Sequence, residues 1–359
     1  MLYAINNNEI KGSSSQRISG LDLIRVVAIF FVIAGHFFMC NTSYTNAPIQ
    51  SISIFVQRMM MSVFYVSVPL FMMLTGYLNC KKTPTTKYYK GMVRVLVAYL
   101  FFSIATIAFR IYYLGEELSF VQWVLKIFNY SAIPYAWYIE MWIGLALLTP
   151  FLNYLYRAIP TMKQKLLLIA TLFVMTSLPN TINDRVELLP DYFHVACYPL
   201  LYYFMGSFIR EYQPTIKVWV GCTIIFLVSL FNPVATLVLG GPNSTDYGLG
   251  GMAMGGCSVF IAVVIFLMLY RKDISVPSVK RWVTHCSMVS LEMYLCCYMF
   301  DALYYPWFKE HFFVSQAQFL PWFFVIVPLC FFSSYLVAAG YSAMNSFAVR
   351  KRKLLSLEQ

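Results

Sequence analysis

The feature that most constrains this chain is the recurrence of apolar runs about as long as a membrane is thick. The 359 residues are 60% hydrophobic and 11% charged, whereas soluble domains usually carry about 25% charged residues. An apolar helix of about 20 residues crosses the hydrocarbon core of a bilayer. The alternating pattern typical of membrane-spanning strands is absent from the sequence. We therefore expect an all-α polytopic membrane protein.

The apolar runs predict about ten transmembrane helices. Their expected ranges are 21–39, 55–78, 91–113, 136–156, 165–179, 195–210, 216–238, 252–270, 287–306 and 319–346. Together they make one integral-membrane domain over residues 19–347, between a disordered cytoplasmic tail at 1–18 and a basic cytoplasmic tail at 348–359. The first 20 residues are polar and lack the pattern of a signal peptide.

The basic residues report the orientation of the chain in the membrane. With the N-terminus in the cytoplasm, 20 of the 26 Lys and Arg residues fall in cytoplasmic segments and five in outer ones, as the positive-inside rule requires. Both termini are then cytoplasmic. Because the net charge of +11 sits in short loops between apolar helices, we expect membrane lipids and not nucleic acid as the partner. The location is a cell membrane, inner or plasma, crossed many times.

Three ionisable residues lie in the first apolar run, namely Asp22, Arg25 and His36. Such residues are costly inside a membrane helix and usually serve function. Arg25 and His36 are eleven positions apart, which is about 1100° of helix rotation, so both lie on one stripe and about 16 Å apart along the axis. Asp22 is three residues before Arg25, on the same face and close enough to pair with it.

His36 and Arg25 are the candidate catalytic residues. Imidazole is the usual general base near neutral pH and can also carry an acyl group. Arg25 stays charged, so it must face protein, water or an anionic ligand such as a phosphate or a polarised thioester carbonyl. The structural alternatives are a core histidine bonded to a neighbouring helix and a plain ion pair of Arg25 with Asp22.

Basic residues after the second helix are candidates for binding an anionic donor. Lys90 and Arg94 are one helical turn apart, and with Lys87 they form a docking site for a polyphosphate. The alternative is ordinary anchoring at the cytoplasmic face. No Walker A motif is present.

Further candidates lie in the fourth and ninth helices and have substrate-binding or supporting roles. Trp137 and Tyr138 form an aromatic platform for a sugar or acyl group, and Glu140 is expected to be a buried carboxylate that orients His36, binds a sugar hydroxyl or pairs with Arg110. The segment SLEMYL (290–295) places Glu292 and Tyr294 in the membrane, and Asp301 follows.

The nine cysteines are expected to be buried apolar residues. Their number is odd, most lie in apolar segments, and no paired CxxC spacing with histidines occurs, so neither a disulfide framework nor a zinc site is expected. We expect no metal and no bound cofactor.

Several segments together resemble the membrane-bound acyltransferase 3 family, the O-antigen and surface-polysaccharide O-acetyltransferases. The run LDLIRVVAIFFVIAGH (21–36) matches the Arg-x10-His signature of the family, with Arg25 and His36 in its two positions. Similar segments are PLFMMLTGYL (69–78), WYIEMWIGLALLTPFL (137–152), YYFMGSFI (202–209) and SLEMYL (290–295). The resemblance covers about residues 18–346.

Two positions depart from the family pattern. The basic Arg-x-x-Arg after the second helix has Gly91 in its first position here, so only Arg94 matches and Lys90 stands beside the gap. The family often has histidine after the Tyr-Leu of the ninth helix, where this chain has Cys297.

The resemblance implies acyl transfer from cytoplasmic acyl-CoA, usually acetyl-CoA, to a hydroxyl of a lipid-linked or cell-surface glycan. His36 would take the proton of the acceptor hydroxyl or relay the acyl group, and Arg25 would orient the donor or stabilise the oxyanion. The competing function is a proton-coupled transporter or flippase of a lipid-linked sugar or small solute. No inverted repeat supports it, because the helix with Arg25 and His36 has no counterpart in the second half. A catalytically dead sensor is opposed by the intact Arg25 and His36.

Overall fold

The computed structural model describes residues 17–39, 47–182, 194–243, 255–313 and 315–355, and this part of the chain contains helices and no strand. The first half contains α1 (Ser19–Met39), α3 (Ile52–Phe64), α4 (Ser67–Asn79), α5 (Thr86–Tyr112), α6 (Phe120–Phe128), α7 (Trp137–Ala158), α8 (Met162–Thr176) and α9 (Pro179–Ile182). The second half contains α10 (His194–Tyr212), α11 (Val218–Gly240), α12 (Gly256–Leu269), α13 (Pro277–Met288), α14 (Ser290–Phe312) and α15 (Phe323–Leu355), with two 3₁₀ turns before α15 at Gln316–Gln318 and Leu320–Trp322.

Helices occur in all ten places where the apolar runs predict them. Within the described chain, six are long and apolar enough to cross a membrane, and a seventh is added if the bent pair α13 and α14 counts as one span. The six are Ser19–Met39, Ile52–Asn79, Thr86–Tyr112, Met162–Ile182, Val218–Gly240 and Gln316–Phe347. Helices α7, α10 and α12 are shorter or less apolar and do not meet this criterion. The described chain is therefore all-α, with six to seven helices that could cross a membrane.

The two expected tails are only partly within the described residues. Residues 1–16 and 356–359 lie outside them. At the other end of the expected N-terminal tail, Arg17 forms an ion pair with Asp22, and α15 continues to Leu355 through the first part of the expected basic tail.

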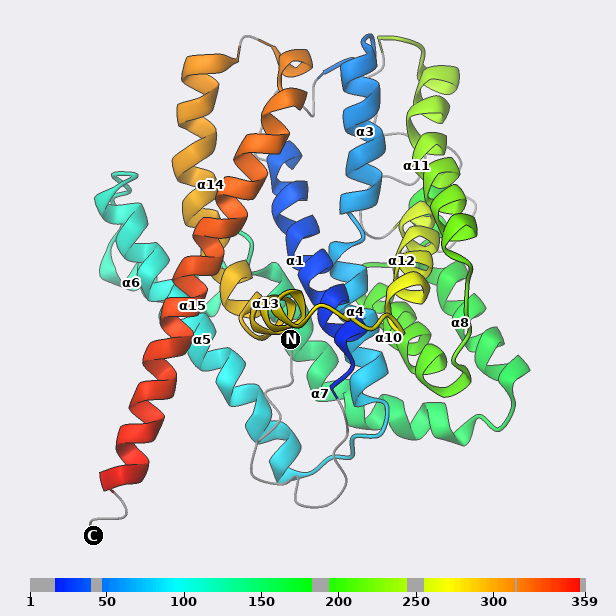
Figure 1. Ribbon diagram of the computed structural model, residues 1–359, viewed down its shortest axis with the longest axis horizontal. Coiled ribbons are helices and arrows are strands. Elements are labelled where there is room, and N and C mark those ends of the chain that lie inside the picture. The colour runs from blue at the N-terminus through cyan, green and yellow to red at the C-terminus, as the bar shows by residue number, and fades with distance from the viewer. Residues whose placement is uncertain (1–16, 40–46, 183–193, 244–254, 314, 356–359) are drawn as a thin grey trace.

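Helix α1 lies in the centre of the molecule. Figure 1 shows it between α14 and α15 on one side and α3, α4 and α12 on the other, and it contacts all five of these helices and α13. Ile24, Ala28, Ile29 and Ile33 are fully buried. A helix that is apolar on every side is typically one enclosed by other helices. This central position is what surrounds Arg25 and His36 with protein.

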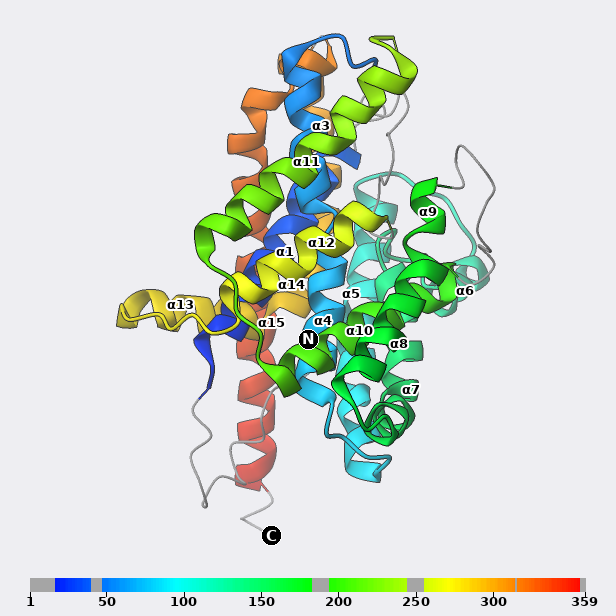
Figure 2. The same ribbon diagram turned by 90° about the vertical axis from the view of Figure 1, so that its right-hand side faces the viewer.

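Helices α13 and α14 meet at a sharp bend, which the apolar pattern did not predict. Their axes differ by 73° across Val289, and Figure 2 shows α13 projecting sideways from the bundle. The polar face of α13 contains Thr284 and Ser287, which lie against the first turns of α1. The bend thus positions hydroxyl groups beside Asp22 and Arg25.

Helices α4 and α10 pack closely against each other, and two glycines make this contact possible. A Cβ atom at Gly76 would lie 1.9 Å from the Tyr203 carbonyl oxygen, and one at Gly206 would lie 2.0 Å from the Met73 carbonyl oxygen. Small residues allow helix backbones to approach in this way inside membranes. The segments PLFMMLTGYL and YYFMGSFI therefore meet each other in the fold.

We expect Gly76→Ala to destabilise the protein, because the methyl group would push α4 away from α10. The cost of overpacking a core is about 1–3 kcal/mol, which should appear as a lower melting temperature of the detergent-solubilised protein. Gly144→Ala is the matched control, since Gly144 lies within α7 and has no atom within 4 Å of the added Cβ. Equal melting temperatures for the two variants would contradict the tight α4–α10 contact.

Candidate functional site

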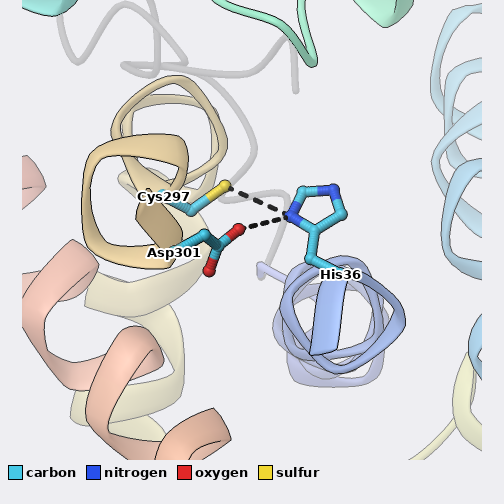
Figure 3. Close-up of side chains that lie close together, drawn as sticks. All are labelled: His36, Cys297 and Asp301. Carbon is cyan, nitrogen blue, oxygen red and sulfur yellow. Dashed lines mark hydrogen bonds and ion pairs between the residues drawn. The ribbon is translucent and has the colours of Figure 1, made fainter. Parts of the chain in front are cut away.

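His36 lies in the interior of the bundle, next to a carboxylate that the sequence did not pair with it. Its Nδ1 atom is 3.0 Å from Oδ2 of Asp301 on α14, and only 8% of His36 and 2% of Asp301 are exposed. A carboxylate accepts hydrogen bonds, so the proton of the neutral imidazole is on Nδ1 and the lone pair is on Nε2. Figure 3 shows Nε2 pointing away from Asp301. The pair thus holds His36 in the form that accepts a proton.

Cys297 occupies the position one helical turn before Asp301 and faces the same imidazole. Its Sγ atom is 3.8 Å from Nδ1 of His36 and 3.2 Å from the Tyr294 carbonyl oxygen, to which the thiol donates. Figure 3 shows both side chains of α14 directed at His36. Position 297, where the acyltransferase 3 family often has histidine, therefore lies in the site beside His36.

Aromatic residues cover His36 on its other side. The Tyr135 ring is 3.8 Å from the imidazole, centroid to centroid, and the Tyr294 hydroxyl donates to the Tyr135 carbonyl oxygen. Tyr294 also packs edge-on against Tyr138, with ring centroids 5.5 Å apart. Of the expected aromatic residues, Tyr138 and Tyr294 thus belong to the environment of His36 through Tyr135.

Arg25 lies in a polar cluster about three turns before His36 along α1. Asp22 accepts from Arg17 at 2.6 and 2.8 Å, from Ser287 at 2.8 Å and from Arg25 at 3.3 Å. Arg25 is 5% exposed, and its Nη1 also donates to Ser287 at 3.3 Å. Its Nε and Nη2 atoms are buried and have no hydrogen-bond partner within the described chain. Asp22 and Arg25 do form the ion pair that their spacing predicts.

The guanidinium of Arg25 uses only Nη1 for hydrogen bonds within the described chain, and its other donors are available to a ligand. Arginine cannot lose its proton, and a buried donor without a partner costs about 1–3 kcal/mol, more for a charged group. The free donors of Arg25 therefore favour an anionic or carbonyl ligand at this position.

The predicted donor-binding residues Lys87, Lys90 and Arg94 are all exposed on the first three turns of α5. They follow a spacing of three and four residues, so they lie on one side of the helix. Arg94 is close enough to interact electrostatically with Glu292, which is 4% exposed and whose Oε2 has no hydrogen-bond partner within the residues described. Glu292 thus lies near Arg94, and it precedes Asp301, the carboxylate beside His36, by nine residues on α14.

Glu140 is not buried, contrary to expectation. It is exposed on the first turn of α7, and so is Trp137. Asp301 occupies the place beside His36 that Glu140 was expected to take. Arg110, the other expected partner of Glu140, instead forms two hydrogen bonds to Glu116, at 2.9 and 2.7 Å. These bonds from Arg110 hold the pKa of Glu116, in the loop after α5, below its ordinary value.

The prediction that Glu140 is buried was wrong because α7 carries apolar residues on every side. In α7, Leu147, Leu148 and Phe151 are exposed and Ile139, Trp142 and Leu145 are buried. Hydrophobic periodicity does not separate the core face from the lipid face in such a helix. Only the packing of α7 shows that residues 137 and 140 face outward.

One protein-family model covers most of this chain. The model of the acyltransferase 3 family, described as an acyltransferase domain, matches residues 18–339, nearly the whole chain. The chain belongs to the acyltransferase 3 family. No curated protein and no solved structure matches the chain significantly.

Family membership and the apolar helices together define the general class of this protein. It is an acyltransferase-family protein of the multi-pass membrane type. The match also includes every segment in which the resemblance was found, from the Arg25 and His36 helix to SLEMYL.

Neither Asp301 nor Tyr135 has an assigned role in the sequence-based predictions, although Asp301 carries a signal. Asp301 is an ionisable residue in a membrane helix, which by itself marks a functional candidate. It also follows Cys297 by four residues, so both are on one helix face. Tyr135 lies in the loop before α7, and nothing in its local pattern indicates that it stacks on His36.

Proposed function

We propose that this acyltransferase 3 protein moves an acyl group, usually acetyl, from cytoplasmic acyl-CoA to a hydroxyl of a lipid-linked or cell-surface glycan. The observation that carries the proposal is the His36–Asp301 pair in the interior of a chain of this family. A histidine with a lone pair on Nε2 and a carboxylate on Nδ1 is the arrangement that activates a hydroxyl group for attack on a carbonyl.

The chemical step follows from the protonation state of His36. Nε2 removes the proton from the acceptor hydroxyl as its oxygen attacks the thioester carbonyl carbon. The carbon–sulfur bond then breaks, and the CoA sulfur leaves with the proton that His36 had taken. Asp301 keeps the proton on Nδ1 throughout and stabilises the imidazolium formed in between.

Arg25 has a donor-anchoring role in this proposal. Because α1 is unbroken from Ser19 to Met39, Arg25 and His36 are about 16 Å apart along it, too far to act on one carbonyl group. An acyl-CoA has its phosphates and its thioester at opposite ends of the extended pantetheine arm. We assign the unpaired donors of Arg25 to the polar parts of the donor and His36 to the thioester.

The exposed basic side chains of α5 extend this donor site. Lys87, Lys90 and Arg94 provide positive charge for the phosphates of CoA, and Lys90 supplies the charge that Gly91 does not. Trp137 and Glu140, exposed at the start of α7, are assigned to the acceptor sugar, where an aromatic face and a carboxylate commonly bind the ring and its hydroxyls. No cofactor takes part in the scheme.

The proposed orientation has both termini in the cytoplasm of a cell or inner membrane, with ten helices embedded. It is supported by the distribution of Lys and Arg along the sequence. Figure 1 agrees with it, since the start of α1, the α4–α5 connection and the end of α15 all lie in the lower half of the molecule. In this orientation the donor-binding side chains face the cytoplasmic pool of acyl-CoA.

The proposal is tested by following a labelled acetyl group. Envelope glycan is purified from cells with the wild-type chain or with no copy, after supply of labelled acetyl-CoA to permeabilised cells, and treated with mild alkali. We expect ester-linked acetate only with the wild-type chain. Equal label without the chain, or glycan movement that needs no acyl-CoA, would contradict acyl transfer and favour a transporter.

A second arm of this test examines the donor site. The double variant Lys90→Gln, Arg94→Gln is expected to raise the KM for acetyl-CoA several-fold and to change kcat little, because these side chains bind the donor far from the reacting carbonyl. Lys163→Gln, at the start of α8, is the matched control for loss of a basic residue. A fall in kcat with unchanged KM would contradict donor binding by α5.

A further inference from the structure

Three metal-ligating atoms converge in the interior of the bundle, on residues far apart in the sequence. Nδ1 of His36, Sγ of Cys297 and a carboxylate oxygen of Asp301 all lie within 4.8 Å of one another. The imidazole comes from α1, and the other two groups come from successive turns of α14. Figure 3 shows the thiol and the carboxylate directed at the same ring nitrogen. The expectation of no metal rested on local spacing, which does not detect ligands on two helices.

The separations between these atoms are close to those of a zinc coordination sphere. Zinc–nitrogen and zinc–oxygen bonds of about 2.0–2.1 Å and zinc–sulfur bonds of about 2.3 Å at tetrahedral angles place neighbouring ligand atoms about 3.3–3.6 Å apart. The observed separations are 3.0 Å from His36 to Asp301 and 3.8 Å from His36 to Cys297. Shifts of a few tenths of an ångström would bring both His36 separations to these values, and the Cys297 sulfur and the Asp301 carboxylate lie within 4.8 Å of each other.

The chemistry of the three donors also fits a soft-to-borderline divalent ion. Imidazole, thiolate and carboxylate are the zinc ligands of proteins, and three of them with an open fourth position are a common arrangement. Asp301 has a second carboxylate oxygen, Oδ1, that is buried without a hydrogen-bond partner in the described chain. A divalent ion would supply positive charge to this carboxylate and to the thiolate formed on binding.

We propose that His36, Cys297 and Asp301 form a reversible binding site for Zn²⁺ and that the bound ion inhibits the protein. The bound ion inhibits because a metal on one nitrogen of the imidazole fixes the protonation of the other. A metal on Nδ1 takes the lone pair there, so the proton of neutral His36 must be on Nε2. Nε2 then donates and no longer accepts a proton. The metal-bound state and the state required by the proposed function therefore exclude each other.

Cys297 supplies the thiolate ligand of this site. The thiol must lose its proton to bind the ion, and metal affinity therefore rises with pH. Cys296 provides a matched comparison on the same helix. It is equally buried, but its Sγ lies against the Ser334 and Met293 carbonyl oxygens and not against His36.

The first experiment measures metal binding without any enzymatic assay. Co²⁺ is titrated into the purified full-length chain in detergent, and visible and near-ultraviolet absorption is recorded. We expect one tightly bound Co²⁺ with a sulfur-to-cobalt charge-transfer band. Cys297→Ser should remove the band and weaken binding at least about tenfold, since it removes a ligand, and Cys296→Ser should retain both.

Two outcomes of this titration would overturn the proposal. One is the absence of a charge-transfer band in a wild-type protein that is monodisperse and helical. The other is a band that Cys297→Ser retains or Cys296→Ser loses. Asp301→Asn is a second ligand variant. It retains Cys297, so we expect weaker Co²⁺ binding with the charge-transfer band still present. This variant tests the site even if Cys297→Ser fails to fold.

The second experiment tests inhibition and rests on the proposed function. Zn²⁺ is added to the acetyl-transfer assay with the wild-type chain and Cys297→Ser, and a chelator is added afterwards. We expect at least about tenfold inhibition of the wild type, reversed by the chelator, and a clearly smaller ratio for Cys297→Ser. Metal binding without acyl transfer in any condition would refute the proposed function alone. Acyl transfer at an unchanged rate with saturating Zn²⁺ would refute the proposed inhibition.

Discussion

Replacing His36 by alanine is expected to abolish acyl transfer while the chain still inserts in the membrane. A positioned general base contributes about 10²–10⁴-fold to a rate, and within α1 no other imidazole is present to replace it. The measurement is the initial rate of acetyl transfer by equal amounts of purified protein. We expect the variant to fall to the background of the assay.

The alanine variant also leaves Asp301 as a buried carboxylate without its partner, which costs stability. His36→Gln separates this effect from the loss of chemistry, because an amide N–H can still donate to Asp301 but the side chain cannot act as a base. It should be as inactive as His36→Ala and closer to the wild type in melting temperature. His285→Ala is the control, since His285 lies on α13 and hydrogen-bonds Tyr335. Wild-type rates in His36→Gln would show that His36 has no role in proton transfer.

Asp301→Asn is expected to be nearly as damaging as the loss of His36, although asparagine has almost the same shape. The amide can donate to Nδ1, which moves the imidazole proton to Nε2 and removes the lone pair that accepts the hydroxyl proton. Serine proteases have the same carboxylate–histidine geometry, and there the carboxylate-to-amide change lowers kcat by about 10⁴-fold. We expect a fall of about 10²–10⁴-fold in kcat, with the KM for acetyl-CoA little changed.

The comparison for Asp301→Asn is Glu116→Gln, which also removes a carboxylate that accepts hydrogen bonds from another side chain. Glu116 pairs with Arg110 in the loop after α5, and we expect its variant to retain the wild-type kcat. If Asp301→Asn were fully active, the Nδ1 contact would be a packing feature and not a determinant of the tautomer. An equal loss in both variants would indicate a general effect of charge removal.

Much of the fold follows from local sequence alone. Each of the ten apolar runs is helical, although the run 55–78 contains two helices. Apolar length and the need to satisfy backbone hydrogen bonds in lipid both operate within one segment. The pairing of Asp22 with Arg25 is also local, since residues three apart on a helix are neighbours. The count of spanning helices is less local, because breaks such as the one between α3 and α4 and the bend between α13 and α14 depend on what surrounds them.

The sequence by itself determined that this is a helical membrane protein of the acyltransferase 3 family with an arginine and a histidine on one stripe of its first helix. The tertiary structure alone decided what His36 touches. Asp301 follows it by 265 residues, and no periodicity carries information over such a separation. The tertiary structure also decided that Glu140 faces outward. In a helix with apolar residues on all sides, the sequence does not distinguish the core face from the lipid face. Packing among many helices sets both results, since it selects one face of each helix from several that are equally apolar.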